Sequence, residues 1–301
     1  MPVSDQIPFA ELSCCPVSIK RPDIDHDTWL DNGFVIAERL LDISRIAELH
    51  DAFDDLFHGR FETGVQPDEV NWQHGTGDPS LTRQICNGWK ADRRIARVVL
   101  NNTLGELVGT LMDWPGVRIM IDNVLWKPAG ARSLAHHQDS AFLSWFTPSD
   151  LCTCWIALDA TSTNGGTLEL VKGSHRWALR KPEGEFHGPE DYREHMNKAA
   201  MAENETVEIV PVEVAAGGGS FHHGHTWHGS GENRGKEPRR AIVLHAMRSD
   251  VRYVPTKLHE GIGPIYGRYR NLANNEMNEE HFPIIWRKDG YRTPSIAEYL
   301  K

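Results

Sequence analysis

The chain has 301 residues, of which 40% are hydrophobic and 25% are charged, and these proportions fit a globular protein rather than a disordered or fibrous one. The formal net charge of −10 at pH 7 argues against a nucleic-acid-binding surface, because neutralising phosphates takes clustered lysine and arginine side chains. Residues 1–6 lack the pattern of a secretory signal, and no apolar stretch reaches the roughly 18 residues of a membrane span. We therefore expect a cytoplasmic protein without nucleic-acid or membrane partners, present as a monomer or homodimer.

The five cysteines do not predict a disulfide framework, because their number is odd and Cys14 and Cys15 are adjacent. Cys152 and Cys154 lie two residues apart in an apolar stretch. They have the softness of metal ligands, but free cysteine packs as a small hydrophobic residue, so we expect both to be buried strand residues.

The first third of the chain is predicted to be rich in helices. A short strand over residues 33–37 precedes apolar residues at helical spacing over residues 40–56, and a second helical pattern covers residues 95–112. Residues 59–80 carry glycines, prolines and polar side chains, which predict a long loop.

From residue 117 the hydrophobic period changes to that of strands. We expect short strands over the following ranges: 117–126, 151–158, 167–171, 206–214, 220–223 and 240–247. Many short strands at such intervals indicate an antiparallel sandwich or barrel of the jelly-roll class.

No linker or internal repeat divides the chain, so a single domain over residues 1–301 is expected. Its parts are a helix-rich region at about 28–112, a β core at about 117–250 and a carboxy-terminal segment at 251–301. The insertion between residues 177 and 205, helical around 190–201, is either a lid on the barrel rim or a surface excursion.

The most informative motif is His137-Gln138-Asp139, followed by His228 about ninety residues later. Residues two apart on a strand point to the same face, so His137 and Asp139 can reach one metal ion while Gln138 points away. Two imidazoles and one carboxylate leave three neighbouring positions open on a ferrous ion, which is the facial triad of non-haem iron oxygenases. His228, after a glycine-rich approach, is expected to supply the third ligand from a distant strand.

Several segments in this order together resemble the phytanoyl-CoA dioxygenase family of iron(II)- and 2-oxoglutarate-dependent oxygenases. The segments that carry the resemblance are Lys127-Pro128-Ala129-Gly130, His137-Gln138-Asp139, Asn164-Gly165-Gly166-Thr167-Leu168, Lys172-Gly173-Ser174-His175, His228-Gly229-Ser230-Gly231-Glu232-Asn233 and Pro238-Arg239. The family usually has proline where Lys172 stands.

The resemblance implies a mainly β fold with flanking helices, namely a double-stranded β-helix or cupin-like jelly-roll. It implies that His137, Asp139 and His228 bind Fe(II) and that O2 and 2-oxoglutarate are used. It also implies that the cosubstrate contacts follow the family pattern, with the distal carboxylate held by one arginine and one serine and the pocket lined by two further residues: Arg239, Ser230, Trp155 and Asn123.

Arginine suits the role in carboxylate binding, because its planar fork meets a carboxylate with two charge-assisted hydrogen bonds. Arg240 is the rival of Arg239. Neighbours on a strand point to opposite faces, so only one of the two can enter the barrel, and the family's offset from His228 favours Arg239.

The predicted activity is oxidation of a small-molecule metabolite, most simply hydroxylation, with release of succinate and CO2 and a role in natural-product biosynthesis. Family relatives that halogenate carry a small residue in place of the carboxylate at Asp139, so its presence favours hydroxylation. Two alternatives stay open: a cupin-like metalloenzyme that does not use 2-oxoglutarate, and a non-catalytic sensor of metal or 2-oxoglutarate.

Other side chains near the motif admit two interpretations each. His136 and His245 are expected to be structural, and His136 has a substrate contact as its alternative. The aromatic residues Phe142, Trp145 and Phe146 form either a pocket wall or core packing. The carboxy-terminal segment, which is rich in tyrosine and arginine, either covers the barrel mouth or packs on the outside.

Overall fold

The computed structural model describes residues 18–22 and 24–301. Cys14 and Cys15 and the amino-terminal residues in which no secretory signal is expected lie outside this part. Within the described residues, no helix combines the length and apolar character required to cross a bilayer.

Helical segments occur along the whole chain, but more of the helical residues lie before residue 112 than after it. The α-helices and 3-10 helices are α2 (His26–Asn32), η1 (Ile43–Arg45), α3 (Ile46–Phe57), η2 (Gly88–Lys90), α4 (Arg93–Val99), α5 (Asn102–Leu111), η3 (Asp139–Phe142), η4 (Thr163–Gly165), η5 (Ser174–Arg176), α6 (Glu194–Glu203), η6 (Pro255–Lys257), α7 (Gly263–Tyr266), η7 (Gly267–Tyr269) and α8 (Ile296–Tyr299). The strands are β1 (Phe34–Ala37), β2 (Glu69–Val70), β3 (Arg83–Cys86), β4 (Gly116–Lys127), β5 (Leu134–His137), β6 (Phe146–Thr147), β7 (Cys152–Ala157), β8 (Leu168–Val171), β9 (Ile209–Pro211), β10 (Gly219–His223), β11 (His228–Ser230), β12 (Arg239–Arg248), β13 (Arg252–Tyr253) and β14 (Ile284–Arg287).

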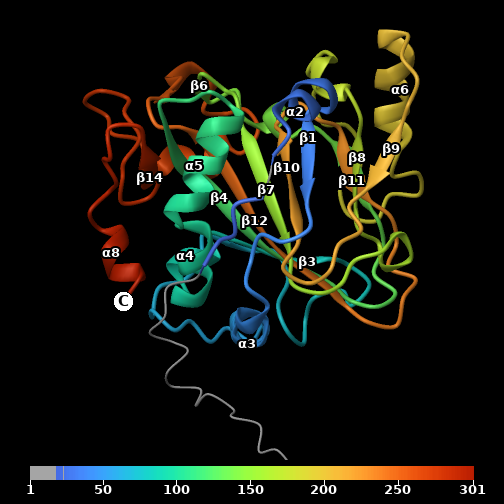
Figure 1. The fold of residues 1–301 in the computed structure, drawn as a ribbon, viewed down its shortest axis with the longest axis horizontal. Helices are drawn as coiled ribbons and strands as arrows, with labels where there is room; N and C mark the ends of the chain where they lie inside the picture. Colours follow the sequence, from blue (N-terminus) through green and yellow to red (C-terminus); the bar gives the residue numbers. More distant parts are fainter. Residues whose placement is uncertain (1–17, 23) are drawn as a thin grey trace, which may run out of the picture.

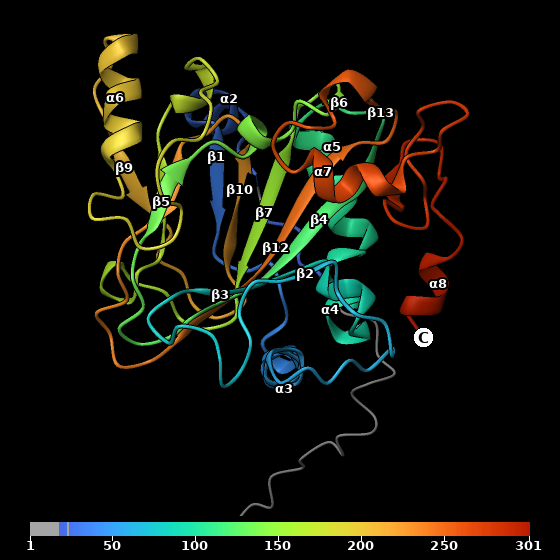
Figure 2. The ribbon, with the colours of Figure 1, turned by 180° about the vertical axis from the view of Figure 1, so that it is seen from behind.

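Two antiparallel sheets form the body of the molecule (Figures 1 and 2). The larger sheet has the order β1-β10-β7-β12-β4-β3-β2 with β14 added beside β4, and the smaller has the order β5-β11-β8-β9. Apolar side chains fill the space between them: Trp155 and Val243 from the larger sheet cluster with Leu168 and Leu170 from the smaller. This architecture confirms the predicted jelly-roll fold.

Helices cover the outer face of the larger sheet. α3 is amphipathic and buries Leu49, Phe53 and Leu56, which recur at helical spacing. These residues belong to one large core cluster with α4, α5 and the outward side chains of the central strands, such as Ile156 and Leu244. The buried, unpaired Cys152 and Cys154 lie in the same cluster, in agreement with the packing interpretation.

The expected single helix over residues 95–112 is wrong, because two helices, α4 and α5, share this range. The side chain of Asn101 accepts a hydrogen bond from the backbone N–H of Thr103 at 2.9 Å and caps α5. An asparagine at this position favours a new helix start over continuation of the old helix. The predicted strand over 206–214 is likewise reduced to β9, and the sequence pattern did not reveal β3 or β14.

Candidate metal and cosubstrate site

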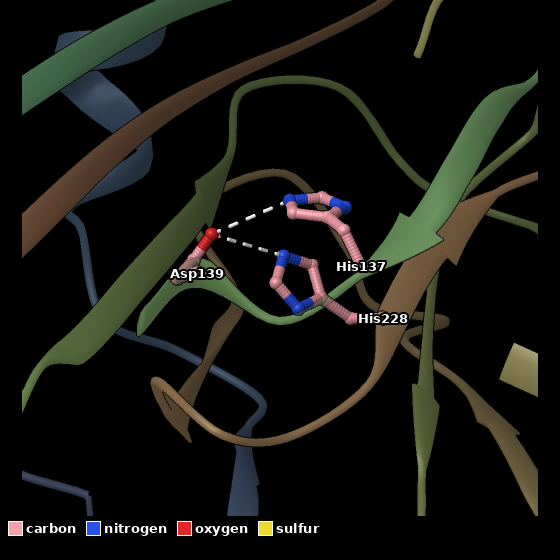
Figure 3. Close-up of side chains that lie close together, drawn as sticks. All are labelled: His137, Asp139 and His228. Atoms are coloured by element: carbon pink, nitrogen blue, oxygen red, sulfur yellow. Dashed lines mark ion pairs between the residues drawn. The ribbon is translucent and has the colours of Figure 1, made fainter. Parts of the chain in front are cut away.

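The three predicted metal ligands lie together at the edge of the smaller sheet. His137 ends β5, His228 begins β11, and the two residues are directly opposed in the antiparallel register. Oδ1 of Asp139 is 3.3 Å from Nε2 of His137 and 3.5 Å from Nε2 of His228, and all three ligand atoms lie within 4.8 Å of one another (Figure 3). The barrel therefore brings His228 beside the His137 and Asp139 pair, which stands about ninety residues earlier in the sequence.

The local backbone differs from the predicted strand in one respect. Asp139 begins the 3-10 helix η3 instead of continuing β5, while Gln138 keeps an extended conformation. The Gln138 amide points away from the site, where its nitrogen donates to the carbonyl of His225 and its oxygen accepts from the N–H of Arg180. One extended residue is thus sufficient to aim both neighbours inward.

Backbone carbonyls orient both imidazoles. Nδ1 of His137 lies 3.0 Å from the carbonyl oxygen of Ala135, and Nδ1 of His228 lies 2.9 Å from that of Thr226. A hydrogen bond donated from Nδ1 leaves the Nε2 lone pair free for a metal ion, which is the usual outer-shell arrangement of histidine ligands. Burial and the nearby His137 ring hold the pKa of His228 well below its ordinary value, so this ring is neutral near pH 7.

The second oxygen of Asp139 is held by a chain of hydrogen bonds that crosses the larger sheet. Thr153 donates to Oδ2 of Asp139 at 2.6 Å and lies 2.9 Å from Nδ1 of His245. His245 Nε2 lies 2.9 Å from the amide nitrogen of Asn123, whose oxygen accepts from Gln84 at 3.2 Å. Because a carboxylate only accepts, the single hydroxyl proton of Thr153 points to Asp139, and the Thr153 oxygen accepts from Nδ1 of His245. The chain leaves Oδ1 facing the histidines.

His222 completes the surroundings of this carboxylate. Its Nε2 lies 3.5 Å from Oδ2 of Asp139, and within the described part of the chain neither ring nitrogen forms a hydrogen bond. Burial alone would raise the pKa of Asp139, but its close contacts with the surrounding histidine rings outweigh burial, and the pKa lies well below the ordinary value. The carboxylate is therefore ionised, as a metal ligand must be.

Arg239 lies at another part of the same cavity. Its guanidinium donates to the carbonyl of Gly166 at 2.9 Å and lies 5.6 Å from the Trp155 ring, while its buried Nε has no hydrogen-bond partner among the described residues. Burial lowers its pKa to about 10. A buried guanidinium with unused donors is costly unless an anion pairs with it, so this end of the cavity is suited to a carboxylate.

Arg240 points to the opposite face of β12. Its Nη2 and Nε atoms lie 2.8 and 3.0 Å from the carboxylate of Asp159, so its charge is already paired. The alternation along the strand thus separates the two candidate arginines as expected.

One cavity of about 90 Å³ connects the metal cluster to Arg239. Its walls come from both sheets and from the insertion after β8, and they comprise Thr82, Gln84, Asn123, Leu125, Leu134, His137, Asp139, Thr153, Trp155, Leu168, Phe186, His187, His222, His228, Gly229, Ser230, Arg239, Val243 and His245. All seven predicted site residues are among them.

The insertion reaches the cavity through Phe186 and His187. The edge of the Phe186 ring meets the His137 ring with centroids 4.9 Å apart, and the N–H of Ala135 donates to the Phe186 carbonyl at 3.0 Å. The segment therefore runs along β5 above the metal cluster, as a lid would.

Other candidate residues lie outside the cavity wall. His136 points away from the cluster, with Nε2 at 3.6 Å from Glu169, and Trp145 and Phe146 are buried in a separate core cluster. Phe142 contacts the His137 ring at 6.1 Å between centroids but does not line the cavity. No residue from 251–301 lines it either; β14 pairs with β4 and Tyr266 packs against Trp145.

A family model described as phytanoyl-CoA dioxygenase matches residues 29–241, which is more than two thirds of the chain. The chain belongs to this family. The prediction of an iron- and 2-oxoglutarate-dependent, non-haem dioxygenase is thereby confirmed, and the donor set of two imidazoles and a carboxylate fits the metal that the family uses.

Individual relatives agree with the family assignment. The chain is 33% identical over 249 residues to the human peroxisomal phytanoyl-CoA dioxygenase, a match that covers 75% of this chain and 68% of that protein. The match to the rat protein, at 32% identity, covers 43% of its length. A probable alpha-ketoglutarate-dependent hypophosphite dioxygenase of Stutzerimonas stutzeri is 24% identical over 74% of this chain and 77% of that protein.

Solved structures share the fold. The epimerase SnoN from nogalamycin biosynthesis, in complex with Fe3+, alpha ketoglutarate and nogalamycin RO, superposes with a TM-score of 0.65 at 23% identity and covers 86% of this chain and 96% of that one. The carbocyclase SnoK from the same biosynthesis has a TM-score of 0.64 at 21% identity and covers 88% and 99%.

Proposed function

We propose that this family member couples decarboxylation of 2-oxoglutarate to oxidation of a small organic metabolite, most simply hydroxylation, with succinate and CO2 as coproducts. In this proposal His137, Asp139 and His228 hold Fe(II). When bound with 2-oxoglutarate and O2, the iron supplies the oxidising chemistry. Support comes from the converging ligand atoms, the neutral imidazole of His228 and the ionised carboxylate.

Arg239 and Ser230 would bind the distal carboxylate of 2-oxoglutarate, with Trp155 and Asn123 as neighbouring walls. The observation that carries the proposal is that one cavity contains both the three metal donors and a buried arginine with unused donors. A dicarboxylic keto acid can span the cavity from the metal donors to Arg239, because it carries a metal-chelating keto acid group at one end and a carboxylate at the other.

The small volume of the cavity under the insertion that carries Phe186 and His187 favours a small substrate. Drug-sized ligand sites measure roughly 300–1,000 Å³, whereas this cavity measures about 90 Å³ with Phe186 and His187 in place. The net charge of −10 disfavours a strongly anionic substrate. SnoN and SnoK belong to nogalamycin biosynthesis, and we place the substrate of this enzyme among natural-product metabolites.

A direct test is aerobic incubation of the iron-loaded protein with 2-oxoglutarate and fractionated metabolites, with succinate and O2 consumption measured together. The proposal predicts succinate release that rises with one fraction and that requires iron. A cupin-like enzyme that does not use 2-oxoglutarate would consume the metabolite without succinate, and a sensor would bind 2-oxoglutarate without O2 consumption. Gel filtration and localisation of the tagged protein test the proposed monomer or homodimer and the cytoplasmic location.

A further inference from the structure

A second buried cation lies behind the proposed carboxylate pocket. Lys127 ends β4, is fully buried, and stands directly opposite Arg239 in the antiparallel register of β4 and β12. Directly opposed residues in antiparallel strands project to the same side of the sheet. Arg239 lines the cavity, whereas Lys127 lies behind its wall, so the two positive charges share one end of the barrel without sharing one surface.

The groups that Lys127 contacts are uncharged. Its ammonium donates to Oγ of Ser230 at 2.8 Å and to the carbonyl of Gly231. Within residues 18–22 and 24–301, neither Lys127 nor Arg239 forms an ion pair. Burial and the neighbouring Arg239 lower the pKa of Lys127 well below its ordinary value, and an anion bound nearby is what would stabilise the charged form of Lys127.

The contact with Lys127 determines the hydrogen-bonding role of the Ser230 hydroxyl. In its charged form Lys127 only donates, so the Oγ of Ser230 accepts from it. The hydroxyl proton of Ser230 then remains for an acceptor elsewhere, and Ser230 lines the cavity that also contains Arg239. A hydroxyl polarised by a cation is a stronger donor to a carboxylate than an isolated hydroxyl.

We propose that Lys127 is a positioning residue that makes this end of the cavity selective for a carboxylate, because it orients and polarises Ser230 beside Arg239. The inference rests on the proposed function, since the anion it selects is the distal carboxylate of 2-oxoglutarate. Lys127 does not touch the cosubstrate in this account and acts through Ser230.

The test compares two keto acids that differ at the far end. Iron-loaded protein is titrated anaerobically with 2-oxoglutarate and with 2-oxopentanoate, which lacks the distal carboxylate, and iron affinity is measured separately. Lys127→Met should weaken 2-oxoglutarate binding by roughly 10- to 100-fold, the range for loss of a hydrogen bond to a charged group, and should leave 2-oxopentanoate and iron binding within about two-fold of the wild type. The exposed Lys172 provides a matched control, because Lys172→Met should change neither keto-acid binding nor iron binding.

Three more variants distinguish the proposed role from a general loss of stability. Ser230→Ala removes the intermediary and should lose the same preference for the dicarboxylate, and adding Lys127→Met to it should weaken binding by less than about two-fold more. Lys127→Gln retains a donor without charge and should show an intermediate loss. Equal weakening of both keto acids in Lys127→Met, additive effects in the double variant, or normal 2-oxoglutarate affinity in Ser230→Ala would each overturn the inference. If neither keto acid binds to the wild-type protein, the proposed function itself is wrong.

Discussion

Thr153 donates a hydrogen bond of 2.6 Å to Oδ2 of Asp139, and the same carboxylate turns Oδ1 toward His137 and His228. The two oxygens therefore have different surroundings. Oδ2 accepts a hydrogen bond from the larger sheet, and Oδ1 faces the proposed metal position beside the smaller sheet. If Asp139 binds the metal as proposed, this division makes it a ligand through one oxygen and preserves open positions for cosubstrate and O2.

Replacement of Thr153 by valine, which keeps the shape and removes the hydroxyl, should weaken iron binding by roughly 10- to 100-fold, as is typical when an outer-shell partner is lost. Thr153→Ser retains the donor and should bind iron as the wild type does. Anaerobic iron titration followed by a competing chelator measures both. Equal affinities for the valine and serine variants would show that Thr153 does not position the carboxylate.

Alanine at His137, Asp139 or His228 should abolish stoichiometric iron binding and leave the fold intact, because open catalytic sites contribute less to folding than closed structural ones. His175→Ala offers a control that should bind iron as the wild type does, since Nε2 of His175 contacts the carbonyl of Leu30 at 3.2 Å and His175 does not line the cavity. Metal analysis after dialysis and far-ultraviolet circular dichroism are the measurements. Full iron occupancy in any of the three ligand variants would remove that residue from the site.

Arg239→Ala should weaken 2-oxoglutarate binding by roughly 100-fold or more, because loss of one partner of a buried charge pair costs about 2–5 kcal/mol. Iron binding should not change. Arg240→Ala breaks the pair with Asp159 on the other face and should cost about 1 kcal/mol of folding stability without affecting the cosubstrate. Calorimetric titration of both variants with 2-oxoglutarate distinguishes them. Loss of 2-oxoglutarate binding in Arg240→Ala but not in Arg239→Ala would mean that Arg240, and not Arg239, faces the cavity.

Phe186→Ala should open the cavity above His137 to water, because the ring edge covers that imidazole. We expect 2-oxoglutarate turnover in the absence of substrate to rise by about two- to five-fold, since exclusion of water suppresses side reactions. Succinate release without added metabolite is the measurement. Unchanged background turnover would indicate that the insertion does not seal the site.

Trp145→Ala should cost about 3–5 kcal/mol of folding stability, because this side chain is fully buried among Phe146, Tyr253 and Tyr266. Urea denaturation gives the loss. The folded fraction should bind iron and 2-oxoglutarate normally; a change of ten-fold or more in either affinity would instead place Trp145 in the active cavity.

The site was largely predictable because its signals are local. The spacing of His137 and Asp139 encodes a shared face, and the alternation at Arg239 and Arg240 encodes opposite ones. The same alternation of side chains along a strand also predicts that Thr153 lines the cavity, because Thr153 stands two residues before Trp155 on β7.

Other features depend on pairing between distant segments. His245 enters the hydrogen-bond chain because β12 and β7 align it with Thr153, and Lys127 meets Ser230 only after the two sheets close. No spacing in the sequence specifies such registers. The split between α4 and α5 was different, since the capping tendency of Asn101 is a local signal that competed with the apolar period.

The most direct test of the central claim is anaerobic titration of the Fe(II)-loaded wild-type protein with 2-oxoglutarate, followed through the metal-to-ligand charge-transfer absorption. The account predicts a saturable band at one cosubstrate per iron, weakened in Arg239→Ala and absent in His137→Ala. A wild-type protein that binds iron yet develops no such band would contradict the assignment of His137, Asp139, His228 and Arg239 to one shared site.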